Sequence, residues 1–91
     1  MKKLSLLLMF YLLLRWDYIG PDPGCFKVYH KNNVLGSWQE VGQATYPRMW
    51  FDLKAARLKS GFMCVSAVSP DGRESDKSSV VFYIKGLGQW R

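Results

Sequence analysis

The sequence predicts an all-β fold, an antiparallel sandwich of six to seven strands. Two observations support this fold class. Short segments alternate apolar and polar side chains with the period of two that is typical of half-buried strands. Clusters of turn-forming Gly, Pro, Asn and Asp residues separate these segments at short intervals. The chain has 91 residues, of which 48% are hydrophobic, and this size and composition fit one folded domain with one small core.

The first 14 residues have two interpretations. Two lysines precede the apolar run of residues 4–14, as in the charged and apolar regions of a secretory signal. This run is too short for a membrane-spanning helix, and no small-residue cleavage site follows it. Residues 12–17 alternate between an apolar face, which carries Trp16, and a face that becomes polar. The alternation favours a strand, preceded by a first strand over residues 2–10.

Turn clusters and alternation also divide the middle of the chain. Residues 19–24 are rich in glycine and proline and end the Trp16 strand. Further strands are expected over residues 25–30, 38–44 and 49–53. Residues 54–59 contain good helix formers but are too few for a stable helix. We expect one helical turn or an ordered loop there.

An antiparallel hairpin with a long polar tip is predicted over residues 61–84. Residues 61–68 include a period-two alternation, and residues 80–84 are β-branched and aromatic. In the connecting Ser69-Pro70-Asp71-Gly72 turn, proline presets φ and glycine supplies a positive φ. From these strands we expect a core made of Leu12, Leu14, Trp16, Phe26, Val28, Val41, Leu53, Val65, Ala67 and Val81.

Several of these segments resemble the fibronectin type III module. Residues 12–17 read L-x-L-x-W-D, residues 38–44 read W-x-x-V-G-x-A, and residues 26–29 follow a Y-x-V-Y pattern with Phe26 in the first place. The hairpin reads V-x-A-V followed by G-x-E-S-x-x-S, at Val65, Ala67, Val68, Gly72, Glu74, Ser75 and Ser78. The resemblance covers about residues 12–84 and implies an immunoglobulin-like sandwich with Trp16 at the centre of its core.

The resemblance also implies the division of the chain. Residues 1–11 would be an apolar N-terminal segment (first strand or signal-like), residues 12–85 the sandwich, and residues 86–91 a C-terminal tail. One family feature is missing. A leucine of the module normally precedes a tyrosine whose hydroxyl bonds back to the corner between two strands. Leu58 is present, but residues 61–63 carry no hydroxyl, so this hydrogen bond is not expected.

The sequence predicts no catalytic residue, no cofactor and no metal site. His30 is the only histidine, and we expect it to be solvated at a strand end. The acidic residues of the hairpin tip lack the spacing of a calcium loop. Cys25 and Cys64 form no metal-binding pattern. Both have the parity of the outer sheet face, and two free thiols are favoured over a disulfide.

The charge pattern predicts a plain solvated surface. The net charge of +6 comes from 13 basic and 7 acidic residues, scattered singly except for the basic cluster within residues 54–59. No basic run typical of a nucleic-acid partner is present, and a membrane partner is not favoured.

The aromatic residues are the best candidates for a binding surface. Tryptophan faces can stack on sugars or on partner side chains, whereas a packing role is the alternative because aromatics dominate small cores. We expect Trp50 to be exposed and leave Trp38 open. The candidate surface comprises Trp38, Tyr46, Trp50 and Trp90.

These observations lead to three functional hypotheses, of which the first two are based on family analogy. The first is a non-catalytic interaction or spacer module of a larger protein, with a protein partner or a neighbouring domain. The second is an accessory C-terminal module of a glycoside hydrolase, such as an endo-β-N-acetylglucosaminidase, where a glycan would be bound. The third is a small secreted or membrane-associated binding protein. It requires residues 1–14 to act as a signal, which would place the chain in the secretory pathway or outside the cell. Otherwise the location is that of the parent protein.

Overall fold

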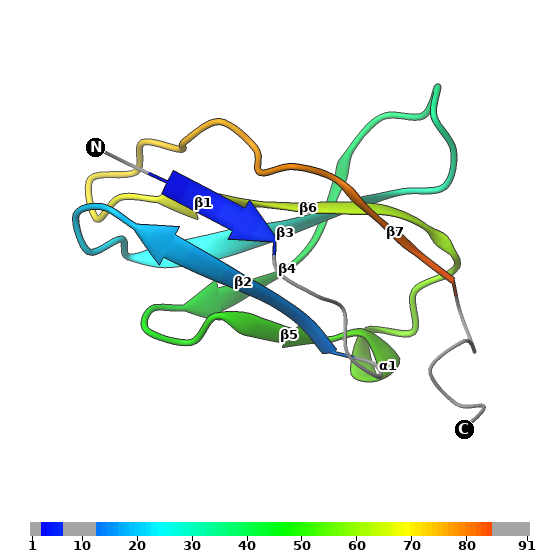
Figure 1. The fold of residues 1–91 in the computed structure, drawn as a ribbon, viewed down its shortest axis with the longest axis horizontal. Coiled ribbons are helices and arrows are strands. Elements are labelled where there is room, and N and C mark those ends of the chain that lie inside the picture. Colours follow the sequence, from blue (N-terminus) through cyan, green and yellow to red (C-terminus); the bar gives the residue numbers. More distant parts are fainter. Residues whose placement is uncertain (1–2, 7–12, 85–91) are drawn as a thin grey trace.

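The computed structural model describes residues 3–6, as backbone only, and residues 13–84 (Figure 1). These residues form two antiparallel sheets, and the all-β sandwich predicted from the sequence is confirmed. A three-stranded sheet has the order β1-β2-β5, and a four-stranded sheet has the order β4-β3-β6-β7. The elements are β1 (Lys3–Leu6), β2 (Leu13–Ile19), β3 (Cys25–Lys31), β4 (Gln39–Thr45), β5 (Trp50–Asp52), α1 (Leu53–Ala56), β6 (Gly61–Val68) and β7 (Val81–Tyr83).

The small sheet is built around β2. Its N-terminal half pairs with β5, where Arg15 lies opposite Trp50, and its C-terminal half pairs with β1. Trp16 points into the sandwich, whereas Arg15 and Asp17 are exposed, as the period-two alternation of the sequence predicts. The predicted first strand is thus confirmed over residues 3–6. Residues 7–12, which include the predicted core residue Leu12, lie outside the described residues.

The core lies between the two sheets. Of the ten predicted core residues, seven are buried, and Val41 and Val81 are half-buried and pack against the core. Val41 is less buried because the β3–β4 register shifts between Val28 and Tyr29, and this β-bulge interrupts the alternation of β4. The buried residues are Leu14, Trp16, Phe26, Val28, Leu53, Val65 and Ala67, joined by Ala44, Met63 and Tyr83, which were not predicted.

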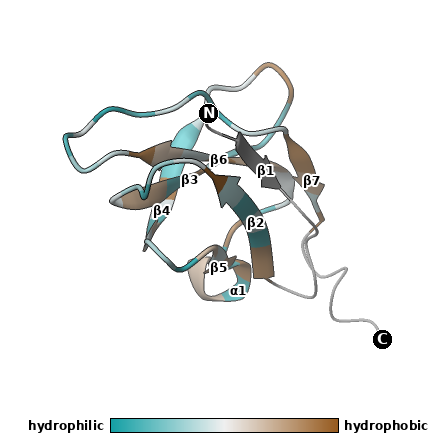
Figure 2. Cartoon of the chain, turned by 60° about the vertical axis from the view of Figure 1, so that its left-hand side comes forward, coloured by the Kyte–Doolittle hydropathy of each residue, from teal (hydrophilic) through white to brown (hydrophobic). Residues whose placement is uncertain are grey.

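β6 is buried on both faces. Met63, Val65 and Ala67 face the core, while Cys64 and Ser66 on the opposite face are also fully buried. The cover comes from the segment that connects β6 to β7, which runs along β6. This connection is hydrophilic along most of its length, whereas β7 is hydrophobic (Figure 2).

Two serines attach this connection to β6. The Ser75 and Ser78 hydroxyls accept hydrogen bonds from the backbone N–H groups of Ala67 (2.9 Å) and Val65 (3.0 Å). In return, the N–H groups of the two serines donate to the carbonyl oxygens of Ala67 and Val65, both at 2.8 Å. The connection therefore satisfies the polar groups of the β6 edge although residues 75–80 form no regular strand.

The segment between β5 and β6 forms one helical turn, as predicted. The Asp52 carboxylate accepts hydrogen bonds from the N–H groups of Lys54 and Ala55 and so caps α1. Arg57 ends the helix in the left-handed conformation, with φ of 55°.

His30 holds the chain that follows the helix. Its Nε2 donates a hydrogen bond to the carbonyl oxygen of Lys59 at 2.7 Å. The prediction that His30 is solvated was therefore wrong, since its side chain is buried. This bond ties the β5–β6 connection to β3.

The two cysteines are free, as predicted. Both side chains lie on the outer face of the four-stranded sheet, where Cys25 is paired with Val68 and Cys64 with Tyr29. This register separates them by four positions along the strands, or about 13 Å at the rise of a β-strand. A disulfide needs Cα atoms within about 7 Å of each other.

Candidate functional site

Four aromatic residues were predicted to form a binding surface, and the structure describes three of them. Trp50 is the most exposed of these three. Its side chain lies on the outer face of the small sheet and is 43% exposed. The Arg48 guanidinium lies over the indole, 4.8 Å from the ring centroid, and also donates a hydrogen bond to the Gln43 carbonyl oxygen. Next to this pair is a shallow hollow of about 450 Å³. Trp50 can therefore contact a ligand, as expected from the sequence.

Tyr46 has a packing role. Its ring contacts Phe26 of the core, with centroids 6.3 Å apart, and its hydroxyl donates a hydrogen bond to Asp22 at 3.1 Å. This hydrogen bond is the main reason why the pKa of the Tyr46 hydroxyl is raised. Tyr46 links the turn after β4 to the β2–β3 connection, so the packing alternative fits it better than a binding role.

Trp38 lies just before β4, at the opposite end of that strand from Tyr46, and is half-buried. The Lys31 ammonium lies over its indole, 4.5 Å from the centroid. Together with Phe62 of β6 and Val80, which directly precedes β7, it lines a hollow of about 140 Å³. Trp38, Tyr46 and Trp50 thus do not share one hollow, and Trp90 lies outside the described residues.

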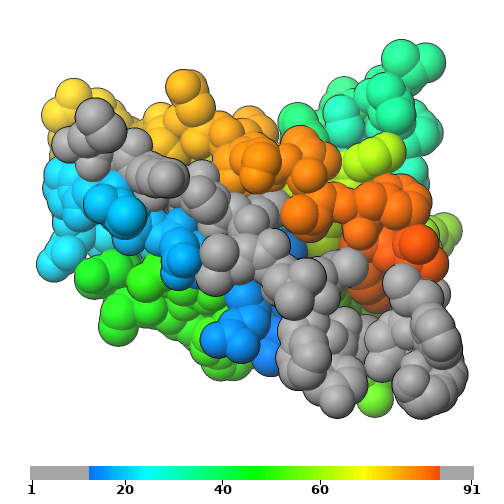
Figure 3. All heavy atoms as spheres, in the orientation of Figure 1, coloured from blue at the N-terminus to red at the C-terminus, as the bar shows by residue number. Residues whose placement is uncertain are grey.

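Apolar side chains surround the Trp38 hollow at one end of the sandwich. The β3–β4 connection contributes Val34, 68% exposed, and Leu35, 95% exposed. Beside them, the Phe62 and Phe82 rings contact each other across β6 and β7, with centroids 5.1 Å apart. Figure 3 shows the β3–β4 connection and β7 side by side at the right-hand end of the molecule. We call this surface the end patch, and it consists of Val34, Leu35, Trp38, Phe62, Val80 and Phe82.

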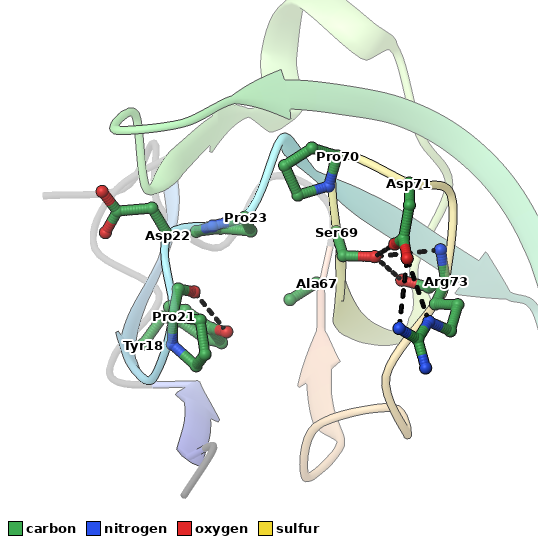
Figure 4. A pocket seen from close by; sticks show the side chains of 9 residues that line it. All are labelled: Tyr18, Pro21, Asp22, Pro23, Ala67, Ser69, Pro70, Asp71 and Arg73. Carbon is green, nitrogen blue, oxygen red and sulfur yellow. Dashed lines mark hydrogen bonds and ion pairs between the residues drawn. The ribbon is translucent and has the colours of Figure 1, made fainter.

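A larger hollow, of about 530 Å³, lies at the other end of the sandwich. In Figure 4, Tyr18, Pro21 and Pro23 stand on one side of it and Pro70, Asp71 and Arg73 on the other. The volume is in the range of small-ligand sites. Most of its polar groups are already paired with each other. Ser69 and Arg73 both bond to the Asp71 carboxylate, and these hydrogen bonds, the one from Ser69 first, lower the pKa of Asp71.

A polar cluster on the outer face of the four-stranded sheet centres on Glu74. Its carboxylate accepts hydrogen bonds from Ser66 at 2.5 Å and from Tyr29, and the Lys27 ammonium lies 3.9 Å away. The hydrogen bonds from Ser66 and Tyr29 lower the pKa of Glu74. Burial, followed by the bond to Glu74, raises the pKa of Tyr29 to about 12. The cluster therefore binds the hairpin connection to the sheet and leaves no free nucleophile.

The titratable side chains of residues 13–84 form no metal-binding arrangement. No group of three or more His, Cys, Asp or Glu side chains there could hold a metal ion. Burial raises the pKa of the Cys64 thiol to about 11, which keeps it protonated and unreactive. None of the helices in the described part of the chain has the length and apolar character needed to cross a membrane.

Neither the end patch nor the larger hollow was predicted from the sequence, although the two turns that form the larger hollow were. Residues 19–24 and the Ser69–Gly72 turn were both predicted as breaks, and in an antiparallel sandwich both fall at the same end. The alternation of β6 places Phe62 on the outer face, opposite Phe82 in the register. The sequence signal for the end patch was therefore the outward position of the two phenylalanines. A second signal was a pair of apolar residues, Val34 and Leu35, between two predicted strands.

Comparison with protein-family models, with curated proteins and with solved structures yields no significant match to this chain. The class that the structure defines is an all-β sandwich, and the fibronectin type III assignment stays a prediction.

Proposed function

We propose that this chain is a non-catalytic interaction module of fibronectin type III-like type that belongs to a larger protein. The resemblance of its second strand and its last hairpin to that module supports the family. The binding role is supported by a different kind of observation, the exposure of large apolar side chains at one end of the sandwich.

The end patch is the observation that carries this proposal. A module that acts only as a spacer needs a core and a solvated surface, and it gains nothing from exposing apolar side chains together. Here Val34, Leu35, Val80 and Phe82 are each at least half-exposed, and two of them, Val34 and Val80, line a hollow beside Trp38. Clustered exposed apolar residues around a pocket are typical of protein-binding surfaces.

Photo-crosslinking in the native cells tests the interaction role. Leu35 is suited to carry a benzoylphenylalanine because its side chain is 95% exposed and so contributes little to the fold. We expect irradiation to yield a discrete crosslinked product with a protein, or with another domain of the same parent chain. The matched control carries the same group at Asp17, an exposed position on the outer face of the small sheet. A spacer would give no discrete product from either position.

A second candidate is an accessory module of a glycoside hydrolase, which one observation favours. Trp50 presents a partly exposed indole on the outside of a sheet, beside a shallow hollow that Arg48 and Asp52 also line. Aromatic faces with nearby hydrogen-bonding groups suit the apolar face and the hydroxyls of a sugar ring. In this case the module would help to hold the glycan near a catalytic domain.

A glycan array decides this second candidate. We expect the chain to bind one class of glycan and the Trp50→Ala variant to lose that binding. The control is Trp38→Ala, which removes an indole from the other surface. Equal glycan binding by the wild type and the Trp50→Ala variant, or no binding by either, would exclude Trp50 as a sugar platform.

A further inference from the structure

The hollow of the end patch has the size of one apolar side chain. It measures about 140 Å³ and is lined by Lys31, Val34, Trp38, Phe62 and Val80. A cavity of roughly 150 Å³ accommodates a benzene ring, so a leucine side chain or a phenylalanine ring fits here. The surrounding patch would cover the rest of such a side chain and keep water away from it, as the surroundings of an interface anchor do.

The charged residue that lines the hollow is cationic, and a second lysine lies on the same face of the sheet. Lys31 forms part of its lining, and its ammonium group bonds to the Val34 carbonyl oxygen at 3.2 Å and lies over Trp38. Lys77 lies over the ring of Tyr29, 4.5 Å from the centroid, and Tyr29 is on the same sheet face as Lys31. Within the described residues neither lysine has a carboxylate at ion-pair distance. Both ammonium groups are therefore available to carboxylates of a partner.

The nearest acidic residues of the sheet are already paired. Glu40 and Glu74 both lie within 4 Å of the Lys27 ammonium, at 3.7 and 3.9 Å. Glu74 also accepts the hydrogen bonds from Ser66 and Tyr29. The Lys77 charge also helps to lower the pKa of Glu74. Of the two lysines, Lys31 is therefore the one that keeps its charge beside the hollow without a neighbouring carboxylate among the described residues.

This charge pattern disfavours a second copy of the chain as the occupant. If two end patches met face to face, Lys31 and Lys77 of one copy would approach the same residues of the other. Like charges brought together in this way are unfavourable. Residues 86–91 contain Arg91 and no acidic residue, so the same argument disfavours the C-terminal segment of this chain.

We propose that the end patch binds an acidic segment of a partner protein in which one apolar side chain, a leucine or a phenylalanine, is flanked by carboxylates. The apolar side chain fills the hollow beside Trp38, and the carboxylates pair with Lys31 and Lys77. This inference rests on the proposed interaction function and names its partner class.

Synthetic peptides test the chemistry of this site. The probe is the capped peptide Asp-Glu-Leu-Phe-Glu-Asp, added to the full-length, ¹⁵N-labelled chain. One control peptide replaces each acidic residue by lysine, and the other replaces Leu-Phe by Ala-Ala. We expect the acidic apolar peptide to shift the amide signals of residues 31–38, 62 and 80–82. The lysine and alanine peptides should bind at least about tenfold more weakly, a difference of roughly 1.4 kcal/mol.

Matched variants locate the binding. Val80→Ser removes an apolar side chain of the hollow that is 50% exposed, and Ile19→Ser removes one that is 64% exposed at another place. We expect Val80→Ser to abolish the shifts and Ile19→Ser to leave the affinity unchanged, with both variants folded as judged by their spectra. Lys31→Met should weaken binding about fivefold or more, and added salt should weaken the wild type more than this variant.

Four results of these titrations would overturn the proposal. They are no shifts at millimolar peptide, equal binding of the lysine peptide, binding that survives Val80→Ser, and concentration-dependent shifts at the same residues without peptide, which would indicate self-association. Vesicles of phosphatidylcholine with about one-fifth phosphatidylserine test a lipid surface. Cosedimentation with them that requires Val80 and Lys31, without binding of the acidic peptide, would also overturn it. If crosslinking from position 35 succeeds while the peptides fail, the module function holds and only the partner class is wrong.

Discussion

The indole of Trp16 packs edge-on against the ring of Phe26, with ring centroids 5.4 Å apart and ring planes at 65°. The two residues come from different sheets, since Trp16 lies on β2 and Phe26 on β3. Tyr18 contacts the same phenylalanine edge-on from β2, at 5.6 Å. This aromatic contact therefore joins the two layers of the sandwich at its centre.

Truncation of Trp16 should strongly destabilise the domain. Trp16→Ala removes the largest side chain of the core, and we expect it to lower the free energy of unfolding by about 3–5 kcal/mol, a large part of the total for a domain of this size. Urea denaturation of the wild type and the variant measures the difference. Trp16→Phe is the matched control and should cost clearly less, because a ring remains against Phe26. An unchanged midpoint in Trp16→Ala would contradict the position of Trp16 in the core.

Gly61 should tolerate no side chain. A Cβ at this position would overlap the backbone carbonyl oxygen of Lys31 and lie 2.9 Å from Nε2 of His30. Because a backbone atom cannot move aside alone, Gly61→Ala should destabilise the protein by about 1–3 kcal/mol. Gly24→Ala is the control, since its Cβ would make only ordinary contacts of 3.5 Å or more. Similar thermal midpoints for the two variants would argue against the close approach of β6 to Lys31.

The Glu74 cluster should contribute stability at neutral pH and lose it in acid. Hydrogen bonds from Ser66 and Tyr29 lower the pKa of Glu74 below its ordinary value of 4.5. A carboxyl group whose folded-state pKa is lowered stabilises the folded protein above its unfolded-state pKa, and this contribution disappears as the pH falls through the folded-state pKa. The free energy of unfolding should therefore fall more steeply below about pH 4.5 in the wild type than in Glu74→Gln.

Urea denaturation at about pH 7 and about pH 3 measures this effect. At the higher pH, Glu74→Gln should be less stable than the wild type by about 1 kcal/mol, and at the lower pH the two should converge. Other carboxylates titrate in both proteins, so the difference between them isolates Glu74. A constant difference at both pH values would show that the charge of Glu74 has no role.

The two thiols should differ in reactivity. Cys64 is fully buried, which raises its pKa to about 11, whereas Cys25 is half-buried. In the folded protein we expect iodoacetamide to modify Cys25 much faster than Cys64, and in urea both should react at once. Mass spectrometry with peptide mapping identifies the labelled residue. Equal labelling of both in the native state would place Cys64 at the surface, and failure of either to react in urea would indicate a disulfide.

Trp50→Ala should leave the fold almost unchanged. The side chain is partly exposed, and its interaction with Arg48 is worth about 0.5–1 kcal/mol. We therefore expect a loss of no more than about 1 kcal/mol in the free energy of unfolding, and Arg48→Ala should remove much of the same amount. A double-mutant cycle of these two substitutions measures the interaction. A loss of several kcal/mol in Trp50→Ala would mean that its indole belongs to the core.

The sandwich could be predicted from the sequence because alternation and turns specify most of its strands independently. Leu14 and Trp16 face inward and Arg15 and Asp17 outward, as the period of two requires. The pattern could not predict that the outer face of β6 is buried as well as its inner face. Cys64 and Ser66 are on the face that alternation assigns to solvent, and they are buried where the connection that follows β6 turns back and packs against the strand. Such burial depends on tertiary packing, which a local pattern does not contain.

The candidate surfaces were harder to predict for the same reason. The residue type alone does not show whether a tryptophan is exposed or buried. Trp16 is buried and Trp50 partly exposed because their neighbours pack differently. The end patch joins the β3–β4 connection to β6 and β7, which are distant in sequence. Gly42 is another example. It lies where a larger residue would be expected on the core side of β4, and the Phe51 ring of the opposite sheet fills the place that its Cβ would take.

The serines that attach the β6–β7 connection also affect how this domain behaves when many copies are crowded together. An open strand edge is a template on which other chains can add strands and form aggregates. At Val65 and Ala67 the edge of β6 is occupied by Ser78 and Ser75, and their own segment offers no regular row of backbone groups for a further strand. Replacing both serines by alanine would leave those two N–H groups without their hydroxyl partners. The expected result is fibrillar aggregation at concentrations where the wild type stays monodisperse.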